Sequence, residues 1–241
     1  MKKKTVIRQM KYILRQFPTE DYLLNLIDAT LLQPDITDHE IISFLHDIDM
    51  LGFKHVIIPP YYLPLANKIT GHIGISLGTV IGFPFGYSLA EVKQHEAALA
   101  IQNGADEIDM VINISALKAG CIATVHDEVR LIKETIGNKI LKVILETCYL
   151  DRKEIGAACL AIKHAKADFI KTSTGFGTAG AQPEDIKLIR QFVGSDIGIK
   201  AAGGIKTLHD VSRMVRLGAT RIGTSRAISI LIEYKDLKRS A

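Results

Sequence analysis

Two lysines and an aspartate are the residues in this sequence most suited to chemistry. Lys171 ends the apolar stretch ADFIK and precedes the hydroxyl- and glycine-rich STGFG, Lys200 lies in IGIKAAGG, and Asp109 lies in ADEIDMVIN. A lysine at the end of a buried strand is costly to keep charged unless something uses it. Two ammonium groups ~6 Å apart on neighbouring strands would repel by roughly 3 kcal/mol at an effective dielectric near 20, which would lower the pKa of one of them.

A lysine with a lowered pKa is an amine nucleophile near neutral pH, and it can attack an aldehyde to form a Schiff base. Asp109 would then shuttle protons or polarise a hydroxyl group. Two interpretations without chemistry compete with this one: Lys171 extends to the surface from a strand end, or a buried Lys–Asp pair only fixes the core. Burying ions for stability alone is unfavourable, so the reactive amine is favoured.

Glycine-rich segments follow the last two candidate strands and have the composition of phosphate-binding loops. Gly203 and Gly204 follow IGIKAA, and residues 223–226 read GTSR. Backbone N–H groups in such loops bind phosphate, and glycine lets the backbone approach the anion. Ser225 would add a hydroxyl and Arg226 a positive charge. Two ordinary strand-to-helix turns remain the alternative.

The run from Gly175 to Gly180 also matches the dinucleotide pattern GxGxxG. A dinucleotide-binding turn should lead directly into a helix. Here Pro183 marks a later helix start, and the preceding strand ends in a lysine, so nucleotide binding is disfavoured.

These side chains can act together only in a fold that brings the ends of their strands together, and the apolar segments indicate such a fold. Candidate strands recur roughly every 20 to 35 residues with helical patterns between them, which is the spacing of βα units in a barrel. We therefore predict an α/β fold, specifically a (β/α)8 TIM barrel, with an open doubly wound sheet as the main alternative. The candidate strands are Leu24–Ala29, His55–Ile58, Gly74–Ile81, Glu107–Ile112, Leu141–Glu146, Phe169–Lys171, Gly198–Ala201 and Arg221–Gly223.

Further charged residues occupy strand positions that a purely structural core would avoid. Asp28 lies in LIDATLL, and Lys142 and Glu146 lie in LKVILE. Since the chemistry of a barrel sits at the carboxyl ends of its strands, we expect Asp28 and Glu146 near the site. Lys142 is early in its strand and should lie lower in the barrel.

Local signals mark several helix starts. Thr37 to Glu40 and Ser88 to Glu91 read as capping boxes, and Pro183 suits a first helical turn. Residues 1–24 have the spacing of an amphipathic helix ended by Pro18, which we interpret as an N-terminal helical extension lying on the barrel. A helix that binds a partner is the less favoured alternative. We expect residues 1–241 to form a single domain.

Composition limits the possible partners. The net charge is only +4 and aromatic residues are 6%, with no basic stripe, so nucleic acid is not an expected partner. The three cysteines lack CxxC spacing and the eight histidines form no metal motif, which predicts reduced cytoplasmic thiols and no metal site. No apolar run reaches the roughly 18 residues of a membrane span, and no signal peptide is evident.

At these residues the chain resembles the deoxyribose-phosphate aldolase family of Schiff-base class I aldolases. The resemblance runs from about Leu26 to Ile230 through IDATLLQPDIT, TVIGFPFG, GADEIDMVIN, LKVILET, ADFIKTSTGFG, IKAAGGIKT and RIGTSRA. It implies a (β/α)8 barrel without cofactor. It also implies reversible cleavage of 2-deoxy-D-ribose 5-phosphate to D-glyceraldehyde 3-phosphate and acetaldehyde.

The family's functional residues can be carried over to matching positions. The Schiff-base lysine falls on Lys171, the lysine that lowers its pKa on Lys200, and the proton-relay aspartate on Asp109. The resemblance implies a substrate-binding set made of Asp28, Thr30, Thr174, Gly175, Gly203, Gly204, Gly223, Ser225 and Arg226.

The chain departs from the family pattern in four places. Residues 28–30 read DAT where the family often has DHT, and Gln33 replaces a frequent lysine. Residues 56–60 read VIIPP in place of VCVNP, and Arg226 stands where a small residue is common. These changes bear on aldehyde tolerance and phosphate recognition.

Two other functions stay open from the sequence. One is a phosphosugar isomerase that uses a carboxylate base, and the other is a barrel that binds phosphorylated ligands without catalysis. In either case we expect small phosphosugars or aldehydes as ligands, and a homo-oligomer, either a dimer or a tetramer.

Overall fold

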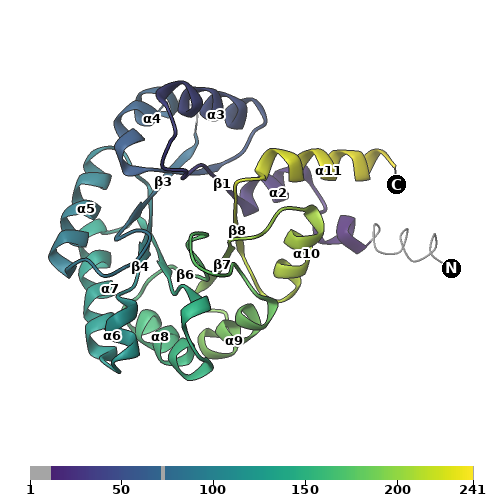
Figure 1. Ribbon diagram of the computed structural model, residues 1–241. Helices are drawn as coiled ribbons and strands as arrows, with labels where there is room; N and C mark the ends of the chain where they lie inside the picture. Colours follow the sequence, from purple (N-terminus) through teal and green to yellow (C-terminus); the bar gives the residue numbers. More distant parts are fainter. Residues whose placement is uncertain (1–11, 72–73, 241) are drawn as a thin grey trace.

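The computed structural model describes residues 12–71 and 74–240 of the 241-residue chain. Eight parallel strands form a closed barrel in sequence order, and helices form a ring around it (Figure 1). The first strand, β1 (Ile27–Thr30), pairs with β2 (His55–Ile58) on one side and with β8 (Arg221–Thr224) on the other. The predicted (β/α)8 barrel is confirmed, and the open doubly wound sheet is wrong.

The other elements follow the expected alternation of strand and helix. The remaining strands are β3 (Ser76–Ile81), β4 (Glu107–Val111), β5 (Ile140–Ile144), β6 (Phe169–Lys171) and β7 (Gly198–Ala202). The helices are α2 (Glu20–Leu26), α3 (Asp38–Met50), α4 (Leu63–Thr70), α5 (Ala90–Gln102), α6 (Ile114–Lys118), α7 (Ile122–Ile136), α8 (Arg152–His164), α9 (Pro183–Val193), α10 (Leu208–Arg216) and α11 (Ala227–Arg239), with single 3₁₀ turns at Pro60–Tyr62 and Thr147–Tyr149.

Successive side chains of each strand point alternately into the barrel and out toward the helices, and this alternation decides which side chains fill the barrel. In β4, Ile108 and Met110 belong to the apolar core, while Asp109 between them contacts lysines of three other strands and so points inward. The strand register places Lys171 of β6 directly beside Lys200 of β7. The interior of this barrel therefore holds charged side chains where bulky apolar ones are usual.

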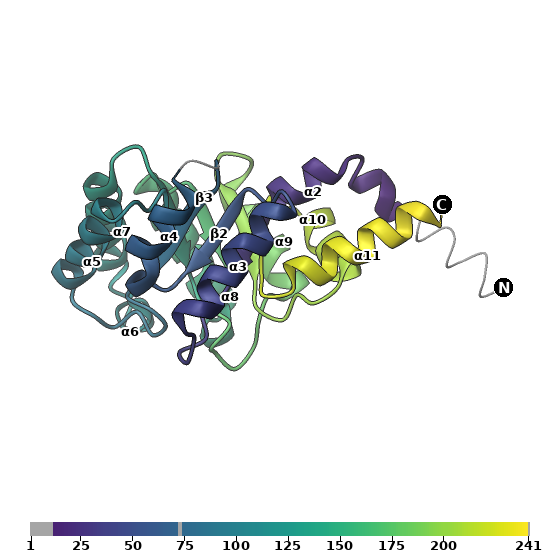
Figure 2. The ribbon, with the colours of Figure 1, turned by 90° about the horizontal axis from the view of Figure 1, so that it is seen from above.

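The N-terminal extension lies against the end of the chain. Figure 2 shows α2 beside α11 at one side of the barrel. The Tyr234 hydroxyl donates to the Phe17 carbonyl at 3.2 Å, and Lys235 forms an ion pair with Glu20 at 2.9 Å. The predicted placement of the extension on the barrel is thus confirmed for its described residues.

The extension holds a helix that the sequence analysis did not predict. Residues 12–16 are helical and the helix ends before Pro18, as expected, whereas residues 1–11 of that prediction lie outside the described residues. A second helix, α2, then begins after Thr19, whose side chain accepts a hydrogen bond from the Tyr22 N–H. The prediction that the first strand starts at Leu24 is wrong, because Leu24 belongs to this capped helix and the strand begins at Ile27.

Two other strand boundaries differ from the prediction by two residues, and several more differ by one. Gly74 was expected in the third strand but lies in a turn with φ +72°, and the strand starts at Ser76. Glu146 was expected at the end of the fifth strand, but its φ of +55° takes the chain out of the extended conformation after Ile144.

The predicted helix starts had mixed outcomes. The capping box at Thr37 and the first-turn position of Pro183 are confirmed. The capping box at Ser88 is wrong, because α5 begins after Leu89 without a side-chain cap. Within the described residues, no helix is both long enough and apolar enough to cross a bilayer.

A buried ion pair outside the barrel fixes the end of β4. Lys93 of α5 is fully buried, and its ammonium group donates to Glu128 of α7 at 2.6 Å and to the Val111 carbonyl at 2.8 Å. Glu128 in turn accepts from the Asn113 N–H at 3.1 Å. This pair therefore ties two outer helices to the strand that carries Asp109.

We predict that Lys93→Met lowers the free energy of unfolding by about 3–5 kcal/mol, because Glu128 would stay buried without its partner. Adding Glu128→Gln should recover most of the loss. Urea unfolding measures both effects. The exposed pair between Lys118 and Glu154 is the control, since Lys118→Met should cost about 0–1 kcal/mol. An equal cost for Lys93→Met and Lys118→Met would contradict the role of the buried pair.

Candidate active site

The Asp109 carboxylate joins three lysines inside the barrel. Its Oδ2 accepts from Lys171 at 2.8 Å and from Lys200 at 2.7 Å, while its Oδ1 accepts from Lys142 at 3.0 Å. All four side chains are buried. The structure thus brings together the predicted set of Lys171, Lys200 and Asp109, with Lys142 as an additional member.

A second group of charges lies next to this one. Asp28 pairs with Lys200 at 2.5 Å and with Arg221 at 2.6 Å, and Lys142 contacts both Asp28 and Glu107. Neither Glu107 nor Arg221 was singled out as a site residue from the sequence. Glu107 could have been found as the residue two before Asp109, on the same face of the strand.

Lys142 lies lower in the barrel than Lys171, as its early place in the strand predicted. The register pairs Lys142 with Asp109 on one side and with Phe169, two residues before Lys171, on the other. The contact of its ammonium group with the Asp109 carboxylate was not predicted.

Burial and charge set the proton affinities of these groups. Burial lowers the pKa of Lys171 from 10.5 to about 8; Asp109 opposes this shift, and the charge of Lys200 adds to it. At a pKa of 8, about one-tenth of Lys171 is neutral at pH 7, against roughly one part in 3,000 at 10.5. Both causes, burial and the charge of Lys200, were expected from the sequence, and burial is the larger of the two.

Asp109 is held ionised. Burial alone would raise its pKa, but Lys142, Lys171 and Lys200 together hold that pKa well below its usual value. The carboxylate therefore accepts hydrogen bonds from all three ammonium groups in the free protein.

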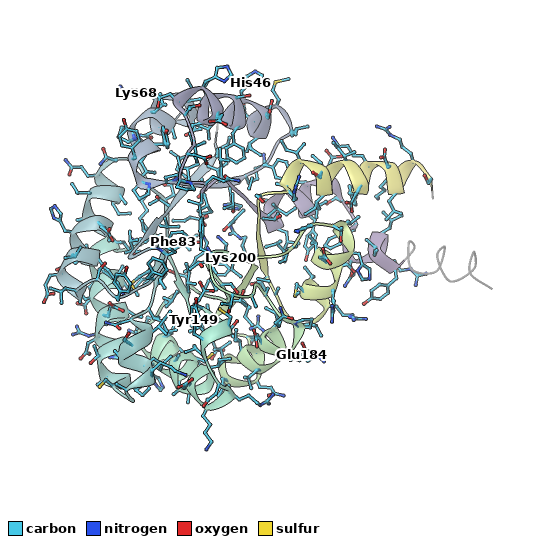
Figure 3. All side chains as sticks on the ribbon, in the orientation of Figure 1. His46, Lys68, Phe83, Tyr149, Glu184 and Lys200 are labelled. Carbon is cyan, nitrogen blue, oxygen red and sulfur yellow. The ribbon has the colours of Figure 1, made fainter. Side chains whose placement is uncertain are left out.

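An open cavity of about 350 Å³ lies above the charged cluster, at the carboxyl ends of the strands. Lys171 is part of its wall, and Figure 3 shows Lys200 near the middle of the ring while His46, Lys68 and Glu184 lie at its periphery. Of the predicted substrate-binding residues, those in the wall are Thr30, Thr174, Gly175, Gly203, Gly204, Gly223, Ser225 and Arg226. Asp28, Asp109 and Lys200 are buried and are not part of this wall.

Other residues of the cavity wall were not predicted. Lys206 adds a second cationic side chain to the wall that includes Arg226, and Phe176 adds an aromatic one. Gln33, which replaces a lysine frequent in the resembled family, also lines the cavity. A neighbouring cavity of about 370 Å³ shares Gln33 and is lined by Pro59, another of the departures.

The glycines of the cavity allow two loops to touch. A Cβ atom on Gly180 would lie 2.2 Å from the Gly203 carbonyl oxygen, and Gly203 itself has φ +85°. The Ala181 N–H donates to this carbonyl at 3.1 Å. The loop after β6 therefore packs directly on the loop after β7, which places their backbones together at the cavity wall.

Comparisons with known proteins agree with this geometry. The model of the DeoC/LacD family aldolases matches residues 25–230. The chain belongs to this family. It is similar to the deoxyribose-phosphate aldolase of Streptococcus mutans, with 46% identity over 85% of this chain and 93% of the relative. It is 43% identical to the deoxyribose-phosphate aldolase of a Thermoanaerobacter species, over 90% of this chain and 99% of that one.

Solved structures of the aldolase family share the barrel. The tetrameric deoxyribose phosphate aldolase of Aeropyrum pernix superimposes with a TM-score of 0.85 and 31% identity, over 95% of this chain and 97% of the other. The aldolase QR15 gives a TM-score of 0.85 and 38% identity, over 89% and 96% of the two chains.

One group of side chains in this family member has the ligand types of a metal site. Oxygen and nitrogen atoms of Asp28, His55 and Glu107 lie within 4.8 Å of one another. The Lys142 ammonium contacts both carboxylates, so a cation is already present between them. The donor set fits an ammonium group, and the expectation that the protein needs no metal or cofactor stays a prediction.

Glu146 fixes the loop that follows Lys171. Its carboxylate accepts from the Thr174 N–H at 3.2 Å and contacts the Thr174 hydroxyl, which in turn accepts from the Phe176 N–H at 3.0 Å. Burial raises the pKa of Glu146, and these hydrogen bonds from Thr174 oppose the rise. Glu146 is thus near the site, as predicted, and its contacts hold the loop.

We predict that Glu146→Ala speeds amide hydrogen exchange in the loop of residues 172–177 by at least about tenfold, because a buried hydrogen bond to a charged acceptor contributes about 1.5–3 kcal/mol. Glu146→Gln retains an acceptor oxygen and the same side-chain length, so it should stay close to the unsubstituted protein. Mass spectrometry of peptides from this loop gives the exchange rates. Equal exchange in both variants would show that Glu146 does not fix the loop.

Proposed function

We propose that the protein is a deoxyribose-phosphate aldolase. It would cleave 2-deoxy-D-ribose 5-phosphate reversibly to D-glyceraldehyde 3-phosphate and acetaldehyde through a Schiff base on Lys171. The observation that carries the proposal is the buried Lys171 amine, with a pKa of about 8, at the wall of a cavity bordered by two glycine loops. The names and identities of the bacterial relatives support the same substrate.

In this mechanism, Lys171 Nζ adds to the C1 aldehyde carbon of the open-chain sugar, and loss of water leaves an iminium. The iminium draws the electron pair of the C2–C3 bond, while the C3 hydroxyl loses its proton and becomes the aldehyde of glyceraldehyde phosphate. The remaining enamine takes a proton at C2, and hydrolysis releases acetaldehyde and the amine. Asp109, 2.8 Å from Lys171 Nζ, is placed to relay protons through water.

The phosphate would bind at the other side of the cavity. Gly203, Gly204 and Gly223 bring backbone close to the anion there, and Ser225 and Arg226 precede the first turn of α11. This arrangement separates the reacting C1 at Lys171 from the phosphate at the loops after β7 and β8, in line with an extended five-carbon chain.

Assembly and location belong to the same proposal. The Aeropyrum pernix relative is described as tetrameric, which supports a homo-oligomer for this chain. The three cysteines are free, which supports a reducing cytoplasmic location.

We predict that borohydride reduction in the presence of substrate traps an adduct on the peptide containing Lys171, and that Lys171→Met abolishes both trapping and turnover. Intact-mass measurement and a glyceraldehyde phosphate assay report the two outcomes. Lys153→Met, at an exposed position of α8, is the control and should leave both unchanged. Trapping at Lys142 or Lys200 would reject the assignment; turnover without trapping would favour an isomerase, and binding without turnover a non-catalytic barrel.

We also predict that Arg226→Ser raises KM for deoxyribose phosphate about 10- to 100-fold, the value of one charge-assisted hydrogen bond. The same change should leave cleavage of unphosphorylated deoxyribose unaffected, and KM should become less sensitive to salt. Steady-state kinetics with both sugars test this. A loss of activity toward both sugars would place Arg226 outside phosphate recognition.

A further inference from the structure

The charges in the barrel interior can be counted, and their balance depends on Lys171. In the part of the chain that the structure describes, three carboxylates line the interior, namely Asp28, Glu107 and Asp109. The cations apart from Lys171 also number three, namely Lys142, Lys200 and Arg221. Those six groups are neutral as a set. Glu146 lies outside the set; burial raises its pKa and the charge of Lys171 opposes the rise, but the two form no ion pair, so a charged Lys171 adds a positive charge that none of the six groups balances.

The three other cations have carboxylate partners on more than one side. Lys142 contacts all three carboxylates, Lys200 pairs with Asp28 at 2.5 Å and Asp109 at 2.7 Å, and Arg221 lies 2.6 Å from Asp28 and 3.6 Å from Glu107. Among residues 12–71 and 74–240, Lys171 forms an ion pair with Asp109 alone, through the oxygen that already accepts from Lys200. The structure therefore provides least compensation for Lys171.

The other ionisable groups around the cluster lie at its two ends. At the start of β2, His55 is partly exposed and its Nδ1 lies 2.9 Å from Glu107. After β5, Glu146 is hydrogen-bonded to Thr174 at the cavity. Strand β3 has no ionisable side chain and contributes Thr79, which donates to the Ile58 carbonyl.

We propose that Arg221, Lys142, Asp28 and Glu107 are positioning residues that set the protonation state of Lys171 by balancing the interior charge, so that Lys171 is the one group able to give up its proton. This inference rests on the proposed function, because it explains how the same amine becomes a nucleophile. It differs from repulsion between two neighbouring lysines, in which only Lys200 would matter.

The low pKa of Lys171 is consistent with this account. After burial and Asp109, the charges of Lys200 and Lys142 are the next contributors to that pKa. Neither Arg221 nor Glu107 pairs with Lys171. They therefore act on the pKa of Lys171 through Asp28, Asp109 and Lys142. A unit charge roughly 10 Å away at an effective dielectric near 20 shifts a pKa by about one unit.

Opposite shifts from two variants test the proposal. The acid limb of kcat/KM should follow the neutral form of Lys171 and lie near pH 8 in the unsubstituted protein. Arg221→Met removes a positive charge, leaves an excess of carboxylate and should move this limb up by about one pH unit. Glu107→Gln removes a negative charge and should move the limb down by about one unit.

Charge-conserving variants separate charge from packing. The double variant Arg221→Met with Glu107→Gln restores the charge balance. Its acid limb of kcat/KM should therefore lie within about 0.3 pH unit of that of the unsubstituted protein. Arg221→Lys keeps the positive charge and should leave the limb in place. Arg130→Met, an exposed position on α7, is the control for removal of a distant positive charge. If Arg221→Met fails to fold, Glu107→Gln and the double variant still give the predicted downward shift and its reversal.

A second readout does not need turnover. The pH dependence of borohydride trapping with acetaldehyde at Lys171 reports the neutral amine directly. If the unsubstituted protein traps acetaldehyde but does not cleave deoxyribose phosphate, the proposed function fails while the charge balance is still tested. If the acid limb of kcat/KM stays fixed in both single variants, or moves in the same direction in both, the charge-balance account is overturned.

Discussion

The whole site depends on the burial of one carboxylate among three lysines. Asp109 accepts from Lys171, Lys200 and Lys142, and all four groups are buried, with only Lys171 at the wall of the cavity. Removing this carboxylate would leave several ammonium groups in a place of low dielectric, which is far more costly than the loss of a surface pair. The closed barrel is what excludes water here, because side chains from neighbouring strands meet at its axis.

The frame around the barrel keeps these short strands in register. The pair between Lys93 and Glu128 holds the end of β4 from outside, and the contact between Gly180 and Gly203 holds two catalytic-face loops together. Glu146 adds a third constraint by fixing Thr174 beside Lys171. Lys171 therefore lies on a strand held from several sides, and the loops after the strands form the cavity wall.

Much of this could be predicted from the sequence, and the failures have physical causes. The spacing of apolar segments predicts eight parallel strands, and the short motifs identify the two lysines and the aspartate. Lys142 was placed correctly below Lys171, but its contacts with Asp28, Glu107 and Asp109 were missed because they depend on the register of the closed barrel. Arg221 was missed because its partners, Asp28 and Glu107, come from strands distant in the sequence.

The helix α2 was missed for a related reason. Its leucines suit a buried strand equally well, and only the Thr19 cap distinguishes the two. Burial and a neighbouring lysine were both expected to lower the pKa of Lys171, but which of the two is larger could not be read from the sequence. Burial requires the whole barrel, whereas a neighbouring lysine can be inferred from two motifs alone.

The contact between α2 and α11 has a consequence for the whole ring. The barrel has one seam, between β1 and β8, where the beginning and the end of the chain meet. The two terminal helices lie across that seam from outside, and the loop with Ser225 and Arg226 leads from β8 into α11. Fraying of either chain end would therefore first loosen the side of the cavity lined by Ser225 and Arg226, whereas Lys171 lies on β6, two strands away from β8.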